Sequence, residues 1–299
     1  MHKLTGFILV IVSAAAYGVM PILARFAYAA GADPLSVLFL RFSIAAAIMA
    51  VIMVLAGMPL PRGQTLLGLF LLGATCYVGQ AVCYFTALTL ADASLVALLL
   101  YLYPVTVTAF AAVFLGEKLT WLKGAALGLA MMGAVLVVGL GGEGKPLGIV
   151  LGIAAPLIYS ATIVIGARLL QSAPAIPAST VIMIAADLSF GGIVAVRGAR
   201  WPATPGGWLA CLGLAVIAGV VAIGAFLMGL ARVGPTYAAL LSTLEPVVAV
   251  SLAALLLGER LTPLNLLGGA MILGAVILLT RSEEHPAASA APDEVGGES

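Results

Sequence analysis

The groups that could do chemistry in this sequence are a deep carboxylate and several tyrosines within long apolar stretches. Glu245 comes ten residues after Pro235 in such a stretch, where a charge costs at least ~2.5–3.5 kcal/mol to insert into lipid. A carboxylate at this depth is typical of a group that binds or relays charge, because an aqueous or paired setting must offset the cost. We interpret Glu245 as the ligand of a substrate amine or the carrier of a coupling proton; a hydrogen bond to a neighbouring helix is the structural alternative.

A polar stripe occurs earlier in the chain. Tyr77, Gln80 and Tyr84 are spaced i, i+3 and i+7, which places them on one face of a helix. Phenol and amide groups that face lipid lack partners, so this stripe should face the interior and either line a path or form hydrogen bonds between helices. The other residues that we expect along the path are Tyr17, Tyr101, Tyr103, Tyr159 and Thr243.

Two arginines also lie inside apolar stretches. We place both Arg25 and Arg41 toward the outer third of their segments. They could attract a carboxylate or phosphate at an outward mouth and act as gating charges. Alternatively, their long side chains snorkel to the interface or pair with Asp33 and Asp92. A further acid in an apolar stretch, Asp187, is expected to face water.

Prolines interrupt three of the apolar stretches, at Pro21, Pro104 and Pro246. A proline inside a helix lacks the backbone donor and loosens the carbonyl four residues before it. Such carbonyls are tolerated at membrane depth where they face a cavity or find other partners, so we predict hinge or binding positions there, with packing kinks as the alternative. The carbonyls concerned belong to Tyr17, Leu100 and Ser242.

The composition defines the surroundings of these groups. Of 299 residues, 63% are hydrophobic and 8% are charged, whereas about 25% are charged in an average soluble protein. Because so few charges cannot cover a soluble surface, lipid must be the solvent for most of the chain. A net charge of +1 supplies no basic face, which excludes nucleic acid as a partner.

Cysteine and histidine usage argues against metals and cofactors. The three cysteines, an odd number, lie in apolar runs and indicate no disulfide framework. His2 and His285 both lie near the ends of the chain, so no histidine-based metal site is expected. The string Gly144-Lys145-Pro146 lacks the spacing of a nucleotide-binding loop. We therefore expect neither a metal nor a cofactor.

Ten segments reach the ~20 mostly apolar residues that a membrane-crossing helix needs. The sequence therefore predicts an all-α integral membrane protein. The predicted spans are 4–29, 35–56, 65–90, 93–115, 121–140, 147–171, 177–196, 207–231, 235–257 and 262–280.

Basic residues predict which way these spans run. With the N-terminus inside, seven Lys or Arg residues flank the inner ends of the spans and four flank the outer ends. The positive-inside rule then favours cytoplasmic N- and C-termini. The inner set is Lys3, Arg62, Lys118, Lys123, Arg168, Arg232 and Arg281; the outer set is Lys145, Arg197, Arg200 and Arg260.

The chain contains an internal repeat. The run LGEKLT at 115–120 recurs as LGERLT at 257–262, an offset of 142 residues, and the same offset relates Tyr17 to Tyr159. Five spans in each half is an odd number, so the second half must enter the bilayer from the opposite face. We predict two inverted five-helix repeats, over residues 1–142 and 143–281, and an acidic, disordered cytoplasmic tail over 282–299.

Three motifs resemble those of the EamA-type drug/metabolite transporters. They are Asp33-Pro34 followed by Arg41, Tyr103-Pro104-Val105 leading to LGEKLT, and Leu244-Glu245-Pro246-Val247 leading to LGERLT. The resemblance covers residues 4–280. It implies a ten-span carrier of small metabolites, often an exporter of amino acids or related compounds, in a bacterial inner membrane. The motifs are specific for the family and nearly silent about the substrate.

Together these features predict a secondary transporter that moves a small metabolite, such as an amino acid or a related amphipathic compound, by alternating access. The resemblance alone implies that the direction is export. Its partners would be a small-molecule substrate, the lipid bilayer and a coupling proton. One alternative is a polytopic intramembrane enzyme, which would need nucleophile–base or metal signatures that the sequence lacks. The other is a channel or scaffold without a transport cycle. We expect no enzyme, and no signal in the sequence defines the oligomeric state.

Overall fold

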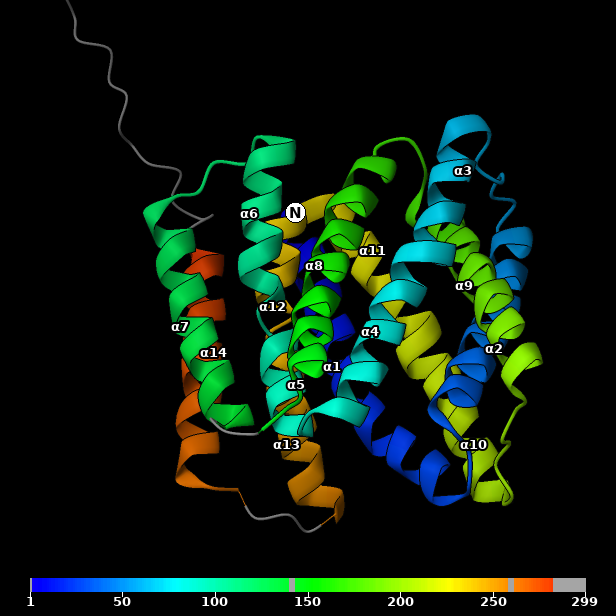
Figure 1. Cartoon of the computed structure of the whole chain (residues 1–299). Helices are drawn as coiled ribbons and strands as arrows, with labels where there is room; N and C mark the ends of the chain where they lie inside the picture. Colours follow the sequence, from blue (N-terminus) through cyan, green and yellow to red (C-terminus); the bar gives the residue numbers. More distant parts are fainter. Residues whose placement is uncertain (1, 140–142, 258–260, 282–299) are drawn as a thin grey trace, which may run out of the picture.

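The computed structural model describes residues 2–139, 143–257 and 261–281 (Figure 1). Within these residues almost the whole chain is helical, and an isolated bridge between Ala91 and Gly144 is the one β pairing. The prediction of an all-α protein is therefore confirmed. The predicted acidic tail at 282–299 lies outside the described residues.

The helices form ten consecutive apolar stretches. Over the described ranges, nine are long and apolar enough to cross a membrane, and a shorter apolar helix, Pro263–Leu279, is the tenth. In chain order the elements are α1 (His2–Ala29), α2 (Pro34–Leu55), α3, η1 and α4 (Gly63–Leu71, Leu72–Tyr77 and Val78–Leu90), α5 and α6 (Ala93–Leu100 and Tyr103–Leu115), α7 (Trp121–Val138), α8 (Pro146–Leu169), α9 (Ala175–Arg197), α10, η2 and α11 (Pro205–Gly213, Leu214–Val221 and Ala222–Val233), α12 and α13 (Pro235–Leu241 and Leu244–Leu257) and α14 (Pro263–Arg281).

The start of α2 is fixed by a carboxylate cap. Asp33 accepts the backbone N–H groups of Leu35 (3.0 Å) and Ser36 (3.2 Å), and Pro34 occupies the first turn, where its missing N–H costs nothing. The same carboxylate accepts the backbone N–H of Arg200 (3.0 Å), which ties α2 to the connection between α9 and α10. Although burial alone would raise it, the pKa of Asp33 is lowered by a hydrogen bond from the Ser36 hydroxyl and by these backbone hydrogen bonds.

Helices from the two halves pack in matching pairs. Helix α1 packs along α11, and its counterpart α8 packs along α4; in the same way α2 contacts η2 and its counterpart α9 contacts η1. In Figure 1, α1 descends while α8 ascends, as an inverted repeat requires. Helices α7 and α14 pack closely at glycine residues. A Cβ on Gly268 would lie only 2.5 Å from the carbonyl oxygen of Gly133.

Both halves contain a π-helical segment at the same place in the repeat. η1 begins at Leu72 and η2 at Leu214, 142 residues later, which is the offset of the repeated motif. A π-helical turn widens the helix and misaligns its carbonyl groups, and such turns are frequent at functional sites. The sequence analysis did not predict either segment.

Two spans are broken rather than kinked, so Pro104 and Pro246 do not lie in the middle of continuous helices as expected, and the hinge role given to them stays a prediction. The chain leaves the helix before Tyr103 and before Leu244, so Pro104 occupies the first turn of α6, where a proline is well tolerated. The carbonyl of Ser242 is not free, because it accepts the backbone N–H of Glu245 (3.0 Å). Prolines inside continuous helices are Pro21 in α1, as predicted, and Pro156 in α8, which the sequence analysis passed over.

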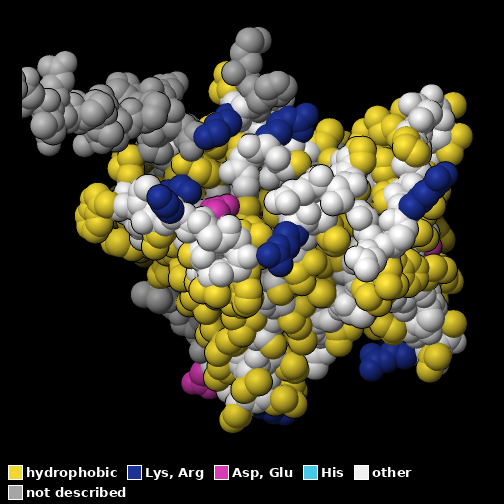
Figure 2. All heavy atoms as spheres, turned by 90° about the horizontal axis from the view of Figure 1, so that it is seen from above, with side chains coloured by type: hydrophobic (Ala, Val, Ile, Leu, Met, Phe, Trp, Pro, Cys, Tyr) yellow, Lys and Arg dark blue, Asp and Glu magenta, His cyan; other side chains and the backbone are white. Residues whose placement is uncertain are grey.

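Basic side chains gather at one face of the bundle. Figure 2 looks down on the face where α1 begins and shows Lys and Arg side chains spread among apolar ones. Arg62 precedes α3, Lys118 follows α6, Arg168 lies in the last turn of α8, and Arg232 lies in the last turn of α11. These helix ends belong to the inner set of the predicted topology.

Candidate functional site

The predicted path residues meet in a cavity inside the helix bundle. Its volume is about 130 Å³, which is room for several water molecules or a compact ligand. Residues from six of the ten apolar stretches line it, namely Tyr17, Met20, Leu38, Arg41, Phe42, Tyr77, Gln80, Ala81, Leu100, Tyr101, Tyr103, Tyr159 and Glu245. Seven of the ten residues predicted as path or gating residues are therefore in one place.

The helix breaks explain why the key side chains reach this cavity. Tyr101 lies in the break between α5 and α6, and Tyr103 begins α6. Glu245 lies in the first turn of α13, directly after the break that follows α12. Irregular backbone is tolerated at membrane depth only where it is buried in protein or lines a cavity, so the breaks and the cavity belong together.

Opposite charges face the cavity. Among its lining residues, Glu245 is the one acid and Arg41 the one base. Arg41 is near enough for its charge to act on the Glu245 carboxylate. The phenols of Tyr17, Tyr101 and Tyr103 belong to residues that line the same cavity. The site therefore combines an anion, a cation and neutral hydrogen-bonding groups within apolar walls, the usual composition of a small-molecule site.

The guanidinium of Arg41 contacts several neighbouring groups, and one of its nitrogens has no hydrogen-bond partner among the described residues. Its Nη2 donates to the carbonyl of Ala218 (2.7 Å) and its Nη1 contacts the sulfur of Met20 (3.1 Å). Its carbon lies 5.8 Å from the ring centre of Tyr17 and 5.3 Å from that of Phe42. The side chain is 7% exposed, yet its Nε has no hydrogen-bond partner among the described residues. Arg41 thus lies in the cavity rather than at an outer mouth, with a buried donor available.

A second buried polar atom lacks a partner. The hydroxyl of Tyr103, which is 3% exposed, forms no hydrogen bond within the described part of the chain. Buried polar atoms are satisfied in the great majority of cases, and an exception in a cavity points to a bound molecule. Tyr103 and Arg41 therefore both offer unused hydrogen-bonding capacity to a ligand.

Several predicted residues lie away from the cavity lining. The ring of Tyr84 packs edge-on against Phe85 at 5.4 Å, although Glu245 still acts on its phenol. The hydroxyl of Thr243 is buried and donates to the carbonyl of Leu240 (2.6 Å). Pro21 and Arg25 lie on the exposed side of α1.

Asp187, which was expected to face water, is half-buried in α9, and its carboxylate accepts a hydrogen bond from the hydroxyl of Ser43 in α2. The site also contains residues that the sequence analysis missed, chiefly Met20 and Phe42, which pack against Arg41. Their type is ordinary for an apolar span, so only the spacing of Met20 from Tyr17 on one helical face hinted at them.

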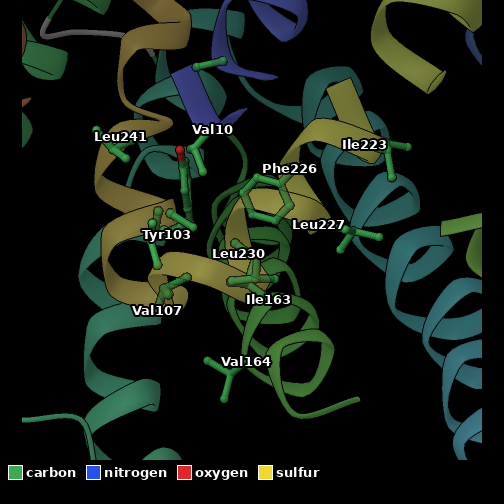
Figure 3. Close-up of a cluster of buried hydrophobic side chains, with 14 of the residues drawn as sticks. Val10, Tyr103, Val107, Ile163, Val164, Ile223, Phe226, Leu227, Leu230 and Leu241 are labelled. Atoms are coloured by element: carbon green, nitrogen blue, oxygen red, sulfur yellow. The ribbon is translucent and has the colours of Figure 1, made fainter. Parts of the chain in front are cut away.

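An apolar cluster closes one side of the cavity. Figure 3 shows Phe226, Leu227 and Leu230 of α11 packed against side chains of α1, α6, α8 and α12. In each of these spans, the residue in the cluster lies nearer to the face where α1 begins than the residue that lines the cavity. The pairs are Val10 before Tyr17, Val107 after Tyr103, Ile163 after Tyr159 and Leu241 before Glu245.

The opposite side is packed less tightly, although the repeat supplies equivalent helices there. Phe226 is 4% exposed, whereas its counterpart Tyr84 is half-buried; Ile163 is buried, whereas its counterpart Pro21 is exposed. In the hydrophobic window of the Pro205–Val233 span, 61% of the residues are buried, compared with 22% in its counterpart Gly63–Leu90. A buried apolar cluster therefore covers the cavity on the face where α1 begins.

Two inverted five-helix repeats around a polar cavity define a polytopic membrane transporter. No group of three or more His, Cys, Asp or Glu that could hold a metal occurs in the described ranges. The chain belongs to the EamA-like transporter family, whose sequence profile matches twice, over residues 4–139 and 146–281. Both ends of the two matches are offset by 142 residues, the spacing of the repeated motif. This assignment makes the chain a transporter rather than an enzyme.

Relatives of similar length carry transporter names. An uncharacterized transporter of Archaeoglobus fulgidus is 30% identical, over 84% of this chain and 88% of that one. A probable terminal-alkyne amino-acid exporter of Streptantibioticus cattleyicolor is 29% identical, over 81% of this chain and 82% of that one. The uncharacterized inner membrane transporter YedA of Escherichia coli is 28% identical, over 83% and 81%. One crystal structure, 21% identical, shares the fold with a TM-score of 0.82 and covers 95% of this chain and 97% of its own.

Proposed function

We propose that the protein is a secondary transporter that exports a small zwitterionic metabolite of the amino-acid type across the inner membrane by alternating access. The observation that carries this proposal is the joint presence of Glu245 and Arg41 in one cavity. Each charge costs free energy in an apolar bundle, and a ligand of complementary charges would compensate both. The named amino-acid exporter among the relatives supports the same substrate class.

The two charges suggest an orientation for the ligand. Glu245 would bind the ammonium group, and Arg41 would bind the carboxylate through its free Nε. The hydroxyl of Tyr103 and the amide of Gln80 would complete the polar contacts, and the rings of Tyr17 and Tyr159 would surround the apolar part. A proton taken up by Glu245 would displace the ammonium group, which gives a simple route to coupling with a proton gradient.

The basic face suggests which side is closed. If the helix ends at Arg62, Lys118 and Arg168 face the cytoplasm, as the positive-inside rule favours, the N- and C-termini are cytoplasmic. The apolar cluster around Phe226 would then close the cytoplasmic side, and the cavity would be in its outward-facing state. In the next step of the cycle the repeats 1–142 and 143–281 would exchange roles, because inverted repeats can adopt each other's arrangement.

Counterflow in proteoliposomes tests the proposal. Vesicles preloaded with an unlabelled amino acid should accumulate the same labelled compound, and Glu245→Gln and Arg41→Gln should abolish this exchange. Glu143→Gln and Arg197→Gln remove equivalent charges at exposed positions outside the cavity and should leave it intact. Downhill flux without counterflow would favour the channel alternative. Failure of amino acids, amines and carboxylates alike to exchange would refute the substrate class.

A further inference from the structure

The two π-helical segments are satisfied in different ways. In the first repeat, the hydroxyl of Thr75 in η1 donates to the carbonyl of Leu71 (2.7 Å), so the bond stays within one span. In the second repeat, the carbonyl of Ala218 in η2 accepts from Arg41 of α2 (2.7 Å), and that of Ala222 accepts from Ser13 of α1 (2.8 Å). The second segment is therefore held by side chains of the opposite repeat.

Both of these bonds are shielded from water. Ser13, Ala218 and Ala222 are all fully buried, so the two carbonyls have no solvent to replace their donors. A Cβ on Gly219 would lie 2.7 Å from the side chain of Ala45, which shows how closely η2 approaches α2 beside Arg41. Both bonds are lost if η2 moves away from α1 and α2, so these tethers favour the present position of η2.

η2 continues directly into the helix that closes the cavity. Helix α11 begins at Ala222 and contributes Phe226, Leu227 and Leu230 to the apolar cluster of Figure 3. A shift of η2 away from α2 would therefore carry these side chains with it. π-Helical turns are a recognised cause of helix bending, and this one directly precedes α11.

Arg41 is shared between the tether and the ligand site. A carboxylate can bind a guanidinium through Nε and the terminal nitrogen on the same edge, which is Nη2. Arg41 lines the cavity and its Nε has no hydrogen-bond partner among the described residues, whereas Nη2 donates to the carbonyl of Ala218. Nη2 carries two N–H groups, so a carboxylate on this edge would share Nη2 with Ala218 and draw the guanidinium away from η2.

We propose that Arg41 is the positioning residue that couples the binding of a ligand carboxylate to the release of η2, with the Ser13 hydroxyl as a second, ligand-independent tether. This inference rests on the proposed function only in its choice of ligand. In the protein without ligand, both tethers keep the side chains of α11 packed in the apolar cluster. Occupancy of Nε and Nη2 by a carboxylate loosens the first tether and lets the closed side open.

The test is cysteine accessibility on the closed side. Leu230→Cys in a background with Cys76, Cys83 and Cys211 replaced by Ala reports opening through its labelling by a membrane-impermeant maleimide. Without any ligand, Ser13→Ala should speed labelling about five- to tenfold, the population shift expected from the loss of one net hydrogen bond. Thr75→Val removes the bond of the equivalent segment that does not cross between repeats and should leave the rate unchanged.

Arg41 is tested in the same reporter. Arg41→Lys should speed ligand-free labelling, because a lysine cannot hold Ala218 in the same geometry, and it should abolish any further increase on adding an exchanged amino acid. An N-methylated amino acid ester, which lacks the carboxylate, should not speed labelling of the wild type.

The outcomes separate this inference from the proposed function. Unchanged labelling in folded Ser13→Ala protein, or an equal increase in Thr75→Val, would overturn the tethers whatever the substrate is. An amino acid that exchanges in counterflow but never changes the labelling rate would overturn the coupling through Arg41. If no amino acid exchanges while the ligand-free effects of Ser13→Ala and Arg41→Lys appear, the substrate class fails and the tethers stand.

Discussion

Replacing Glu245 by glutamine is the sharpest perturbation of the cavity. The substitution keeps the size of the side chain and its capacity to accept a hydrogen bond, and removes one charge. Glu245 faces a cavity whose single cationic lining residue is Arg41, so the main loss is its attraction for a ligand cation. The substitution does not change the backbone in the first turn of helix α13, so we expect the variant to fold.

The size of the effect follows from the setting of the carboxylate. Glu245 is half-buried, so an intermediate effective dielectric constant of about 20 applies, and a contact at about 4 Å is worth roughly 4 kcal/mol. Partial exposure to cavity water and the opposing charge of Arg41 reduce this to about 2–4 kcal/mol. The dissociation constant for an amino acid should therefore rise about 30- to 700-fold.

Direct binding to purified protein measures this effect without relying on transport. Titration calorimetry or scintillation proximity should show the loss in Glu245→Gln and retention of most of the affinity in Glu245→Asp, whereas Glu143→Gln serves as the control. If coupling uses the same carboxylate, the pH dependence of exchange should also disappear in Glu245→Gln. Binding within about threefold of the wild type, in protein with an unchanged melting temperature, would refute the assignment of Glu245 to the ligand site.

Three further predictions concern packing, capping and closure. Gly268→Ala would place a Cβ 2.5 Å from the carbonyl oxygen of Gly133 and should cost about 1–3 kcal/mol and lower the Tm, whereas Gly124→Ala, which meets nothing within 4 Å, should not. The lowered pKa of Asp33 contributes stability that is complete above its ordinary value of 3.8 and is lost as the pH falls through the lowered value. The Tm of the wild type in detergent should therefore fall in acid more steeply than that of Asp33→Asn. Phe226→Tyr buries a hydroxyl in the apolar cluster and should speed maleimide labelling of a cysteine on the closed side; an unchanged rate would contradict the role given to that cluster.

The spans and the repeat could be predicted from sequence because both are local properties. Hydropathy over ~20 residues defines a membrane helix by itself, and the recurrence of LGEKLT as LGERLT needs no knowledge of the fold. The grouping of Tyr17, Tyr103 and Glu245 also followed from the sequence, since polar groups in apolar helices have few places to go. The cavity gathers all three of these residues.

The features that the sequence did not reveal depend on contacts between distant residues. Arg41 and Ala218 are 177 positions apart, and nothing near Arg41 in the chain indicates that it donates to a π-helical carbonyl. A π-helical turn differs from an α-helical turn by one residue, a change that hydropathy does not register. The breaks before Tyr103 and Leu244 were misread as proline kinks because proline is equally compatible with the first turn of a new helix.

In the proposed cycle, differences between the two repeats would decide which state the protein occupies. If the repeats were identical in sequence, the state closed on one face would have the same energy as the state closed on the other, because each is the other turned over. In this structure Phe226 is buried in the cluster that covers one side of the cavity. In the opposite state its counterpart Tyr84 would take the equivalent place and would bury its hydroxyl among apolar side chains.

Such a hydroxyl costs about 1–3 kcal/mol, which shifts an equal population to a ratio between about 5 and 150. A ligand can reverse this bias only through contacts that differ between the two states. Arg41 donates to the carbonyl of Ala218 in this structure, and under our proposal it would bind a carboxylate in the other state, which would make it a contact of that kind. In the proposed cycle the asymmetric residues of the repeat would therefore set the resting state, and the charged residues of the cavity would let a ligand shift the population away from it.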